Sequence, residues 1–67
     1  MMNELERELF KAAESAERIY YQAIDVYGGA SPLVELSRGR WYACRDLLAN
    51  CKLGAAYANW KREKVNM

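Results

Sequence analysis

The segment WYACRDLLANCKLGAAYANW, which runs from Trp41 to Trp60, can be read as one continuous helix or as two helices that part near Gly54. As one helix it carries two apolar stripes whose centres lie roughly 140° apart, because successive residues turn by about 100°. The first stripe is Val34, Trp41, Cys44, Leu48, Cys51, Ala55 and Ala58, and the second is Tyr42, Ala49, Leu53, Ala56 and Trp60. A pair of helices needs only one stripe for its core, so the second stripe predicts contact with another molecule.

Gly54 is the residue on which the two readings differ. Glycine in a helix interior costs about 1 kcal/mol relative to alanine, and Gly54 follows Lys52-Leu53 at a point where it could end a helix. The first apolar stripe nevertheless keeps its phase across Gly54, whereas a break would normally reset that phase. We therefore expect one long helix over residues 32–64, and three helices broken at Gly54 are the alternative.

Upstream of this segment, residues 3–27 predict a first helix, with Asn3 as its N-cap and Gly28 as the glycine that ends it. Its apolar residues recur at intervals of four and three without a slip, which is the heptad pattern of helices that pack on other helices. This heptad seam is Leu5, Leu9, Ala12, Ala16, Ile19, Ala23 and Val26. A second column beside it is Phe10, Ala13, Tyr20, Ile24 and Tyr27.

The connection between the two predicted helices is short. Ser31 is a favourable N-cap, and Pro32 loses no hydrogen bond at the first position of a helix. Helices joined by so few residues are normally antiparallel neighbours. The sequence therefore predicts an all-α antiparallel helical hairpin, about 3–27 and 32–64, in a single domain over residues 1–67.

The chain is short enough to need help with its stability. A single domain of 67 residues buries a modest core, and such domains are usually stabilised by disulfides, a metal or oligomerisation. Histidine is absent, and Cys44 and Cys51 would lie about 10.5 Å apart along one helix, too far to bridge. We therefore expect a homodimer in which two hairpins form a four-helix bundle. The residues expected in the dimer core are Phe10, Tyr20, Ile24, Tyr27 and Leu47.

A surface for another partner is expected on the second helix. Its basic column and the second apolar stripe lie side by side, and Trp, Tyr and Arg are the residue types that dominate protein-binding hot spots. The expected partner-binding residues are Arg38, Tyr42, Arg45, Lys52, Leu53 and Trp60. Two alternatives stay open for the basic residues. They could pair with the acidic residues that predominate in residues 1–27, or they could contact the phosphates of a nucleic acid.

The sequence contains no set of residues typical of catalysis. Without histidine there is no Ser/His or Cys/His pair, and Glu14 and Glu17 alternate with basic residues as a solvated face would. We therefore expect no enzyme activity, metal or cofactor. The N-terminal residues are acidic and amphipathic, and no apolar run approaches the roughly 20 residues of a membrane span, so we expect a cytoplasmic protein without a membrane partner.

These observations predict a small regulator or adaptor that binds an unidentified protein, of a size and character typical of phages, plasmids and other mobile elements. In architecture, the expected dimer resembles the Rop-like plasmid regulators. The alternative function is RNA or DNA binding by the basic face of the dimer, as in a Rop-like regulator. A subunit with a purely structural role in an assembly is the third possibility.

Overall fold

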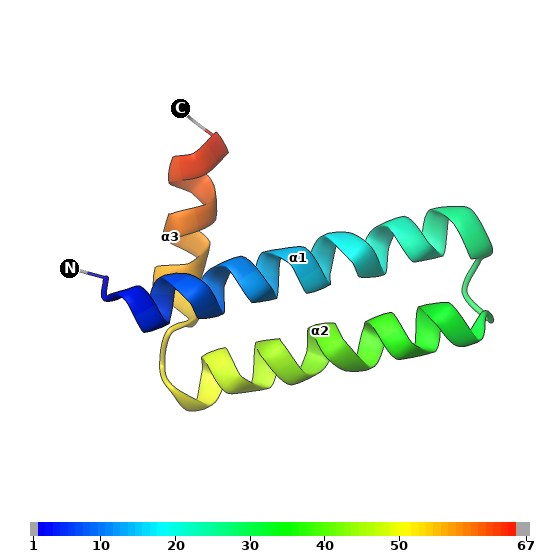
Figure 1. Cartoon of the computed structure of the whole chain (residues 1–67), viewed down its shortest axis with the longest axis horizontal. Coiled ribbons are helices and arrows are strands. Elements are labelled where there is room, and N and C mark those ends of the chain that lie inside the picture. The colour runs from blue at the N-terminus through cyan, green and yellow to red at the C-terminus, as the bar shows by residue number, and fades with distance from the viewer. Residues whose placement is uncertain (1, 66–67) are drawn as a thin grey trace.

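The computed structural model describes residues 2–65, and this part of the chain forms three α-helices and no strand. The helices are α1 (Glu4–Tyr27), α2 (Pro32–Asn50) and α3 (Gly54–Val65). Figure 1 shows α1 and α2 side by side in opposite directions, with α3 lying across the N-terminal half of α1 and pointing away from the pair. The expected all-α fold is confirmed.

The ends of α1 and the start of α2 follow local capping rules, as expected. The Asn3 side chain accepts a hydrogen bond from the backbone N–H of Glu6 at 2.8 Å, and the Glu6 carboxylate accepts one from the backbone N–H of Asn3 at 3.2 Å. Gly28 ends α1 with φ at 77°, a conformation that favours glycine. The Ser31 hydroxyl accepts from the backbone N–H of Leu33 at 3.1 Å, directly before Pro32.

The prediction of one long helix over residues 32–64 is wrong, because α2 ends at Asn50. The backbone N–H of Leu53 donates to the carbonyl of Leu48 at 2.8 Å, and that of Lys52 donates to the carbonyl of Ala49 at 3.1 Å. These two bonds, with Lys52 in the left-handed region at φ 58°, form a Schellman motif. The residue that ends α2 is therefore a lysine, and Gly54 instead begins α3.

The phase of the first apolar stripe does not continue across this turn. Trp41 and Leu48 are buried as the stripe predicts, but Ala55 and Ala58 are exposed. Tyr57, which belongs to neither stripe, is the buried residue of α3. The alternative of three helices is therefore the one observed, but the break lies at residues 51–53 and not at Gly54.

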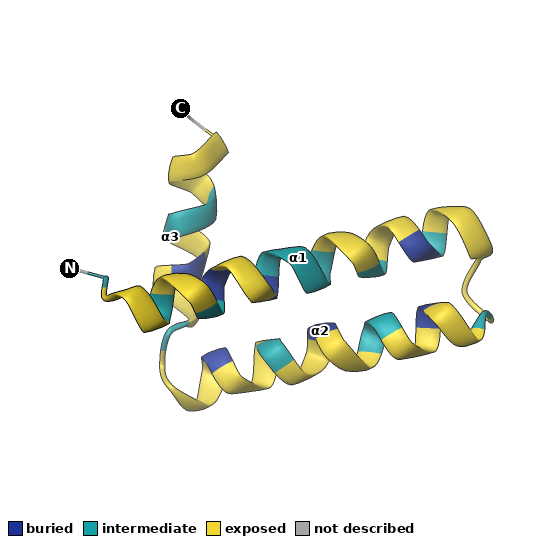
Figure 2. Ribbon diagram, in the orientation of Figure 1, coloured by how far each residue is buried: buried dark blue, intermediate teal, exposed yellow. Residues whose placement is uncertain are grey.

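The core lies where the three helices meet. Figure 2 shows the buried residues on the facing sides of α1 and α2 and near the start of α3. This cluster comprises Phe10, Ala13, Trp41, Leu48 and Tyr57. The Tyr57 ring centroid lies 5.6 Å from that of Phe10 and 6.4 Å from that of Trp41, so α3 closes the core over both helices. Burying each of these large side chains stabilises the fold by about 2 kcal/mol.

Candidate functional site

Aromatic and basic side chains of α1 and α2 gather beside the core, and we call them the aromatic–basic surface. Its members are Tyr20 and Tyr21 of α1 and Arg38, Tyr42 and Arg45 of α2. The Arg45 guanidinium lies over the Tyr42 ring, 4.3 Å from its centroid, which is a favourable cation–π geometry. The Tyr42 ring in turn meets the Tyr20 ring edge-on at 6.3 Å, and Tyr20 packs against Tyr21 at 5.3 Å.

The two arginines of this surface differ in how far their charges are balanced. Arg38 donates to the Tyr20 hydroxyl at 3.4 Å and to the Glu35 carboxylate at 2.9 Å. The hydrogen bond to Tyr20, followed by the charge of Glu35, raises the pKa of Arg38 above its ordinary value. Within residues 2–65 no carboxylate forms an ion pair with Arg45. Arg45 is therefore a fixed cation that is available to a partner.

The structure brings together three of the six residues expected to bind a partner. Arg38, Tyr42 and Arg45 share the aromatic–basic surface, whereas the turn after Asn50 separates them from the other three. Lys52, Leu53 and Trp60 lie at this turn and beyond it. Because the continuous helix does not exist, the stripe that was expected to join Tyr42 to Trp60 does not exist either.

Leu53 and Trp60 are half-buried against the core. The Trp60 ring stacks on Tyr57 at 6.2 Å and lies 5.8 Å from Phe10. Both side chains also line an open hollow of about 640 Å³ between the start of α1 and α3, together with Met2. Their main contacts are therefore with this chain.

Tyr20 and Tyr21 are members of the surface that sequence reasoning did not place there. Tyr20 was expected in a dimer core, and adjacent residues of a helix point 100° apart, so periodicity alone did not group it with Tyr21. Their assignment to the surface depends on the register between α1 and α2, which sets Tyr20 opposite Arg38 and Tyr42. The only signal in the sequence was the pair of adjacent tyrosines.

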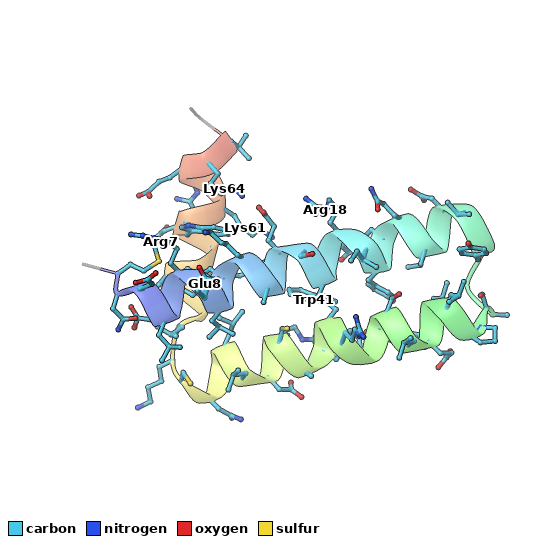
Figure 3. All side chains as sticks on the ribbon, viewed as in Figure 1. Arg7, Glu8, Arg18, Trp41, Lys61 and Lys64 are labelled. Carbon is cyan, nitrogen blue, oxygen red and sulfur yellow. The ribbon has the colours of Figure 1, made fainter. Side chains whose placement is uncertain are left out.

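The acidic residues of α1 hold α3 in place. The Glu17 carboxylate accepts hydrogen bonds from Lys61 Nζ at 2.7 Å and from the Tyr57 hydroxyl at 3.1 Å, and Lys64 Nζ donates to Glu14 at 2.7 Å. Figure 3 shows Lys61 and Lys64 extending from α3 near its crossing with α1. The expected pairing of basic residues with the acidic helix therefore occurs, but the lysines of α3 supply it. Glu14 and Glu17 are half-buried and paired rather than part of a solvated face.

Burial and the neighbouring carboxylate both act on Tyr57. Burial of the phenol, followed by the negative charge of Glu17, raises the pKa of Tyr57 well above its ordinary value. The phenol is therefore neutral in the fold, and it can donate to Glu17 over the whole physiological pH range. Lys61 also lies 5.0 Å from the Tyr57 ring centroid, which adds a cation–π contact to the same site.

A groove runs between α1 and α2 on another side of the molecule. Three hollows of about 470, 420 and 310 Å³ follow one another along it. The first is lined by Leu5, Leu9, Leu47 and Cys51, the second by Ala12, Ala16, Ile19, Ala43 and Cys44, and the third by Ala23, Val26, Tyr27 and Leu33. Leu5 and Glu14 are nine residues apart and so point in opposite directions from α1, which places the groove opposite α3.

The residues expected in a dimer core are dispersed. Phe10 is only 1% exposed because Tyr57 and Trp60 of the same chain cover it, so it is not available to a second chain. Tyr20 belongs to the aromatic–basic surface, and Ile24 is half-buried. Tyr27 and Leu47 line the groove. Of the expected set, these two are therefore the residues that a second copy could reach through the groove.

The described residues contain no group of three or more His, Cys, Asp or Glu side chains placed to hold a metal ion. None of the three helices is long and apolar enough to cross a membrane. The chain matches no known family model, no curated protein and no solved structure.

Proposed function

We propose that this chain is a small, non-enzymatic regulator or adaptor that binds another protein through the aromatic–basic surface. The observation that supports this most directly is Arg45, which is stacked on the exposed ring of Tyr42 and has no carboxylate partner within residues 2–65. Stacking restricts the arginine side chain before binding, so less conformational entropy is lost when a partner arrives. Arginine and tyrosine are also over-represented among the residues that carry binding energy.

The balance of charge favours a protein over a nucleic acid. The whole chain carries a formal net charge of only +1, whereas nucleic-acid-binding domains are usually clearly basic. Lys61 and Lys64 are engaged by Glu17 and Glu14, and Arg38 by Glu35. These ion pairs reduce the number of cations that could contact phosphates. RNA or DNA binding by the basic residues is the second candidate, and Arg45 supports it by the same lack of a carboxylate partner.

We also propose how the chain assembles. The helices α1 and α2 act as an antiparallel hairpin, and two hairpins associate as a homodimer that forms a four-helix bundle. The apolar groove along α1 and α2 supports this arrangement, because one copy leaves much of the heptad seam uncovered. A purely structural role in an assembly would use the groove alone and would leave the aromatic–basic surface without a partner.

Capture of partners by single-residue variants tests this function. The tagged chain retains a specific protein from an extract of its natural host, Tyr42→Ala and Arg45→Ala lose it, and Val65→Ala keeps it. Val65 is a matched control because it is 82% exposed near the end of α3, away from the aromatic–basic surface. If all variants retain the same protein, the surface has been wrongly assigned. If they retain nuclease-sensitive material whose binding falls steeply with salt, nucleic acid is the partner.

A further inference from the structure

Every second residue of the α1 heptad seam faces away from the chain's own core, whereas Leu9, Ala16 and Ala23 face it. Leu5 is 80% exposed, Val26 is 71% exposed and Ile19 is 47% exposed. Across the groove on α2, Leu33 and Leu47 are 48% and 47% exposed. An unbroken apolar pattern that one copy leaves so open is typical of a face that packs against another helix pair.

The size of this face suits a dimer. α1 has 24 residues and is therefore about 36 Å long at 1.5 Å per residue. Two helices side by side are roughly 20 Å wide, so the face offers about 700 Å². Stable protein–protein interfaces bury about 800 Å² on each partner, so one helix pair on another nearly meets that requirement.

The charge of the face suits a copy of itself. Two charged residues line the three hollows, the acidic Glu8 and the basic Arg40. A face with one charge of each sign is neutral overall, so two identical faces do not repel each other. Small residues such as Ala12 and Ala16 also leave room along the groove for the larger side chains of an opposing helix pair.

We propose that the groove between α1 and α2 is the docking site for a second copy of this chain, joined by a two-fold axis. The inference rests on the proposed dimer and specifies which face forms it. Tyr42 lies nine residues from both Leu33 and Cys51, so it points away from the groove on α2. Docking through the groove thus leaves one aromatic–basic surface on each outer side, and the dimer has two binding sites for its partner.

Sedimentation equilibrium of variants over a wide concentration range tests the docking site. The wild-type chain forms a dimer, and Leu47→Glu and Ile19→Glu each weaken its association by about 100-fold or more, because each buries charges without partners. Val65→Glu is the matched control and leaves the association unchanged. Circular dichroism confirms that each variant is helical. Because both groove residues are about half exposed in one chain, their substitution leaves the core in place.

Alkylation of the cysteines by iodoacetamide gives a readout that needs no substitution. Cys51 and Cys44 both line the groove, so their reaction slows as the protein concentration rises and the dimer forms. A wild-type chain that is monomeric at high micromolar concentration overturns both the docking site and the proposed dimer. A dimer that persists in both glutamate variants, with alkylation independent of concentration, overturns the docking site alone.

Discussion

Lys52 adopts a left-handed backbone conformation, which residues with a side chain disfavour. It is the only residue other than glycine with positive φ in residues 2–65, and a side chain in the left-handed region costs about 1 kcal/mol. The Schellman bonds of the turn hold it there, and the carbonyls at the end of α2 accept them. No glycine occupies the position that ends α2. The sequence therefore predicted either a break at Gly54 or a continuous helix without a break.

Lys52→Gly is expected to stabilise the fold by about 0.5–1 kcal/mol, because glycine adopts the left-handed conformation without steric cost. Urea unfolding of both chains measures the difference. Lys52→Ala is the matched control, since it removes the charge but keeps the Cβ that causes the strain. If alanine stabilises as much as glycine does, the effect belongs to the lysine charge and not to the backbone.

The Tyr57 phenol makes the stability depend on pH in the alkaline range. Its pKa is raised in the fold, while in the unfolded chain it ionises near pH 10. Its contribution is therefore fully present below pH 10 and is lost as the pH rises further. Tyr57→Phe is expected to lower the unfolding free energy by about 1–2 kcal/mol at pH 7, because it removes the hydroxyl that donates to Glu17.

Above pH 10 the difference in unfolding free energy between wild type and Tyr57→Phe is expected to shrink. Urea titrations at several pH values between 7 and 11 check this, and the phenylalanine chain controls for the other tyrosines and for the lysines. If the unfolding free energies of wild type and Tyr57→Phe differ by the same amount at every pH in this range, the fold does not keep the Tyr57 phenol neutral.

At the scale of elements, local capping signals were sufficient for α1 and for the start of α2. Asn3, Gly28 and Ser31 act through hydrogen bonds to residues no more than four positions away, so sequence alone identifies them. The docking of α3 depends on contacts over much longer separations. Lys61 meets Glu17, and Tyr57 meets Phe10, only after the turn at Lys52 has directed α3 across α1.

Trp60 shows how this turn changes the interpretation of a residue. As part of a continuous helix it would project beyond α1 and be free to bind a partner, whereas the observed ring packs on Phe10 and Tyr57. Trp60→Ala is therefore expected to cost about 2 kcal/mol, below the full cost for a core tryptophan because the side chain is half-buried.

Hydrogen exchange locates the effect of Trp60→Ala within the structure. Amides of α3 are expected to lose protection more than those of α1 and α2, because α3 is docked mainly through its aromatic and lysine contacts. Val65→Ala, on the same helix but 82% exposed, is expected to change stability by no more than about 0.5 kcal/mol. An equal loss of protection in all three helices would mean that α3 unfolds only together with the rest.

At the scale of the whole molecule, composition predicted that one chain would leave apolar surface uncovered, but not which surface. Phe10 and the other residues of the expected dimer core were predicted to face a second chain. Because α3 folds back over Phe10, that residue is covered within the chain, whereas Tyr27 and part of the heptad seam are left in the groove. The turn that docks α3 also changed the candidate binding surface. Arg38, Tyr42 and Arg45 remain on that surface, whereas Trp60 packs against the core.

A dimer formed through the groove links folding to association, so thermal stability should depend on protein concentration. For a chain of 67 residues, each tenfold rise in concentration is expected to raise the wild-type Tm by about 3–5 °C, since mass action favours the associated native state. The Tm of Leu47→Glu should depend much less on concentration, whereas that of Val65→Glu should follow the wild type. Calorimetry at several concentrations measures all three. A wild-type Tm that stays constant with protein concentration would mean that no second copy covers the groove in the native state. The Tm depends on concentration only when the native chain is associated and the unfolded chain is not.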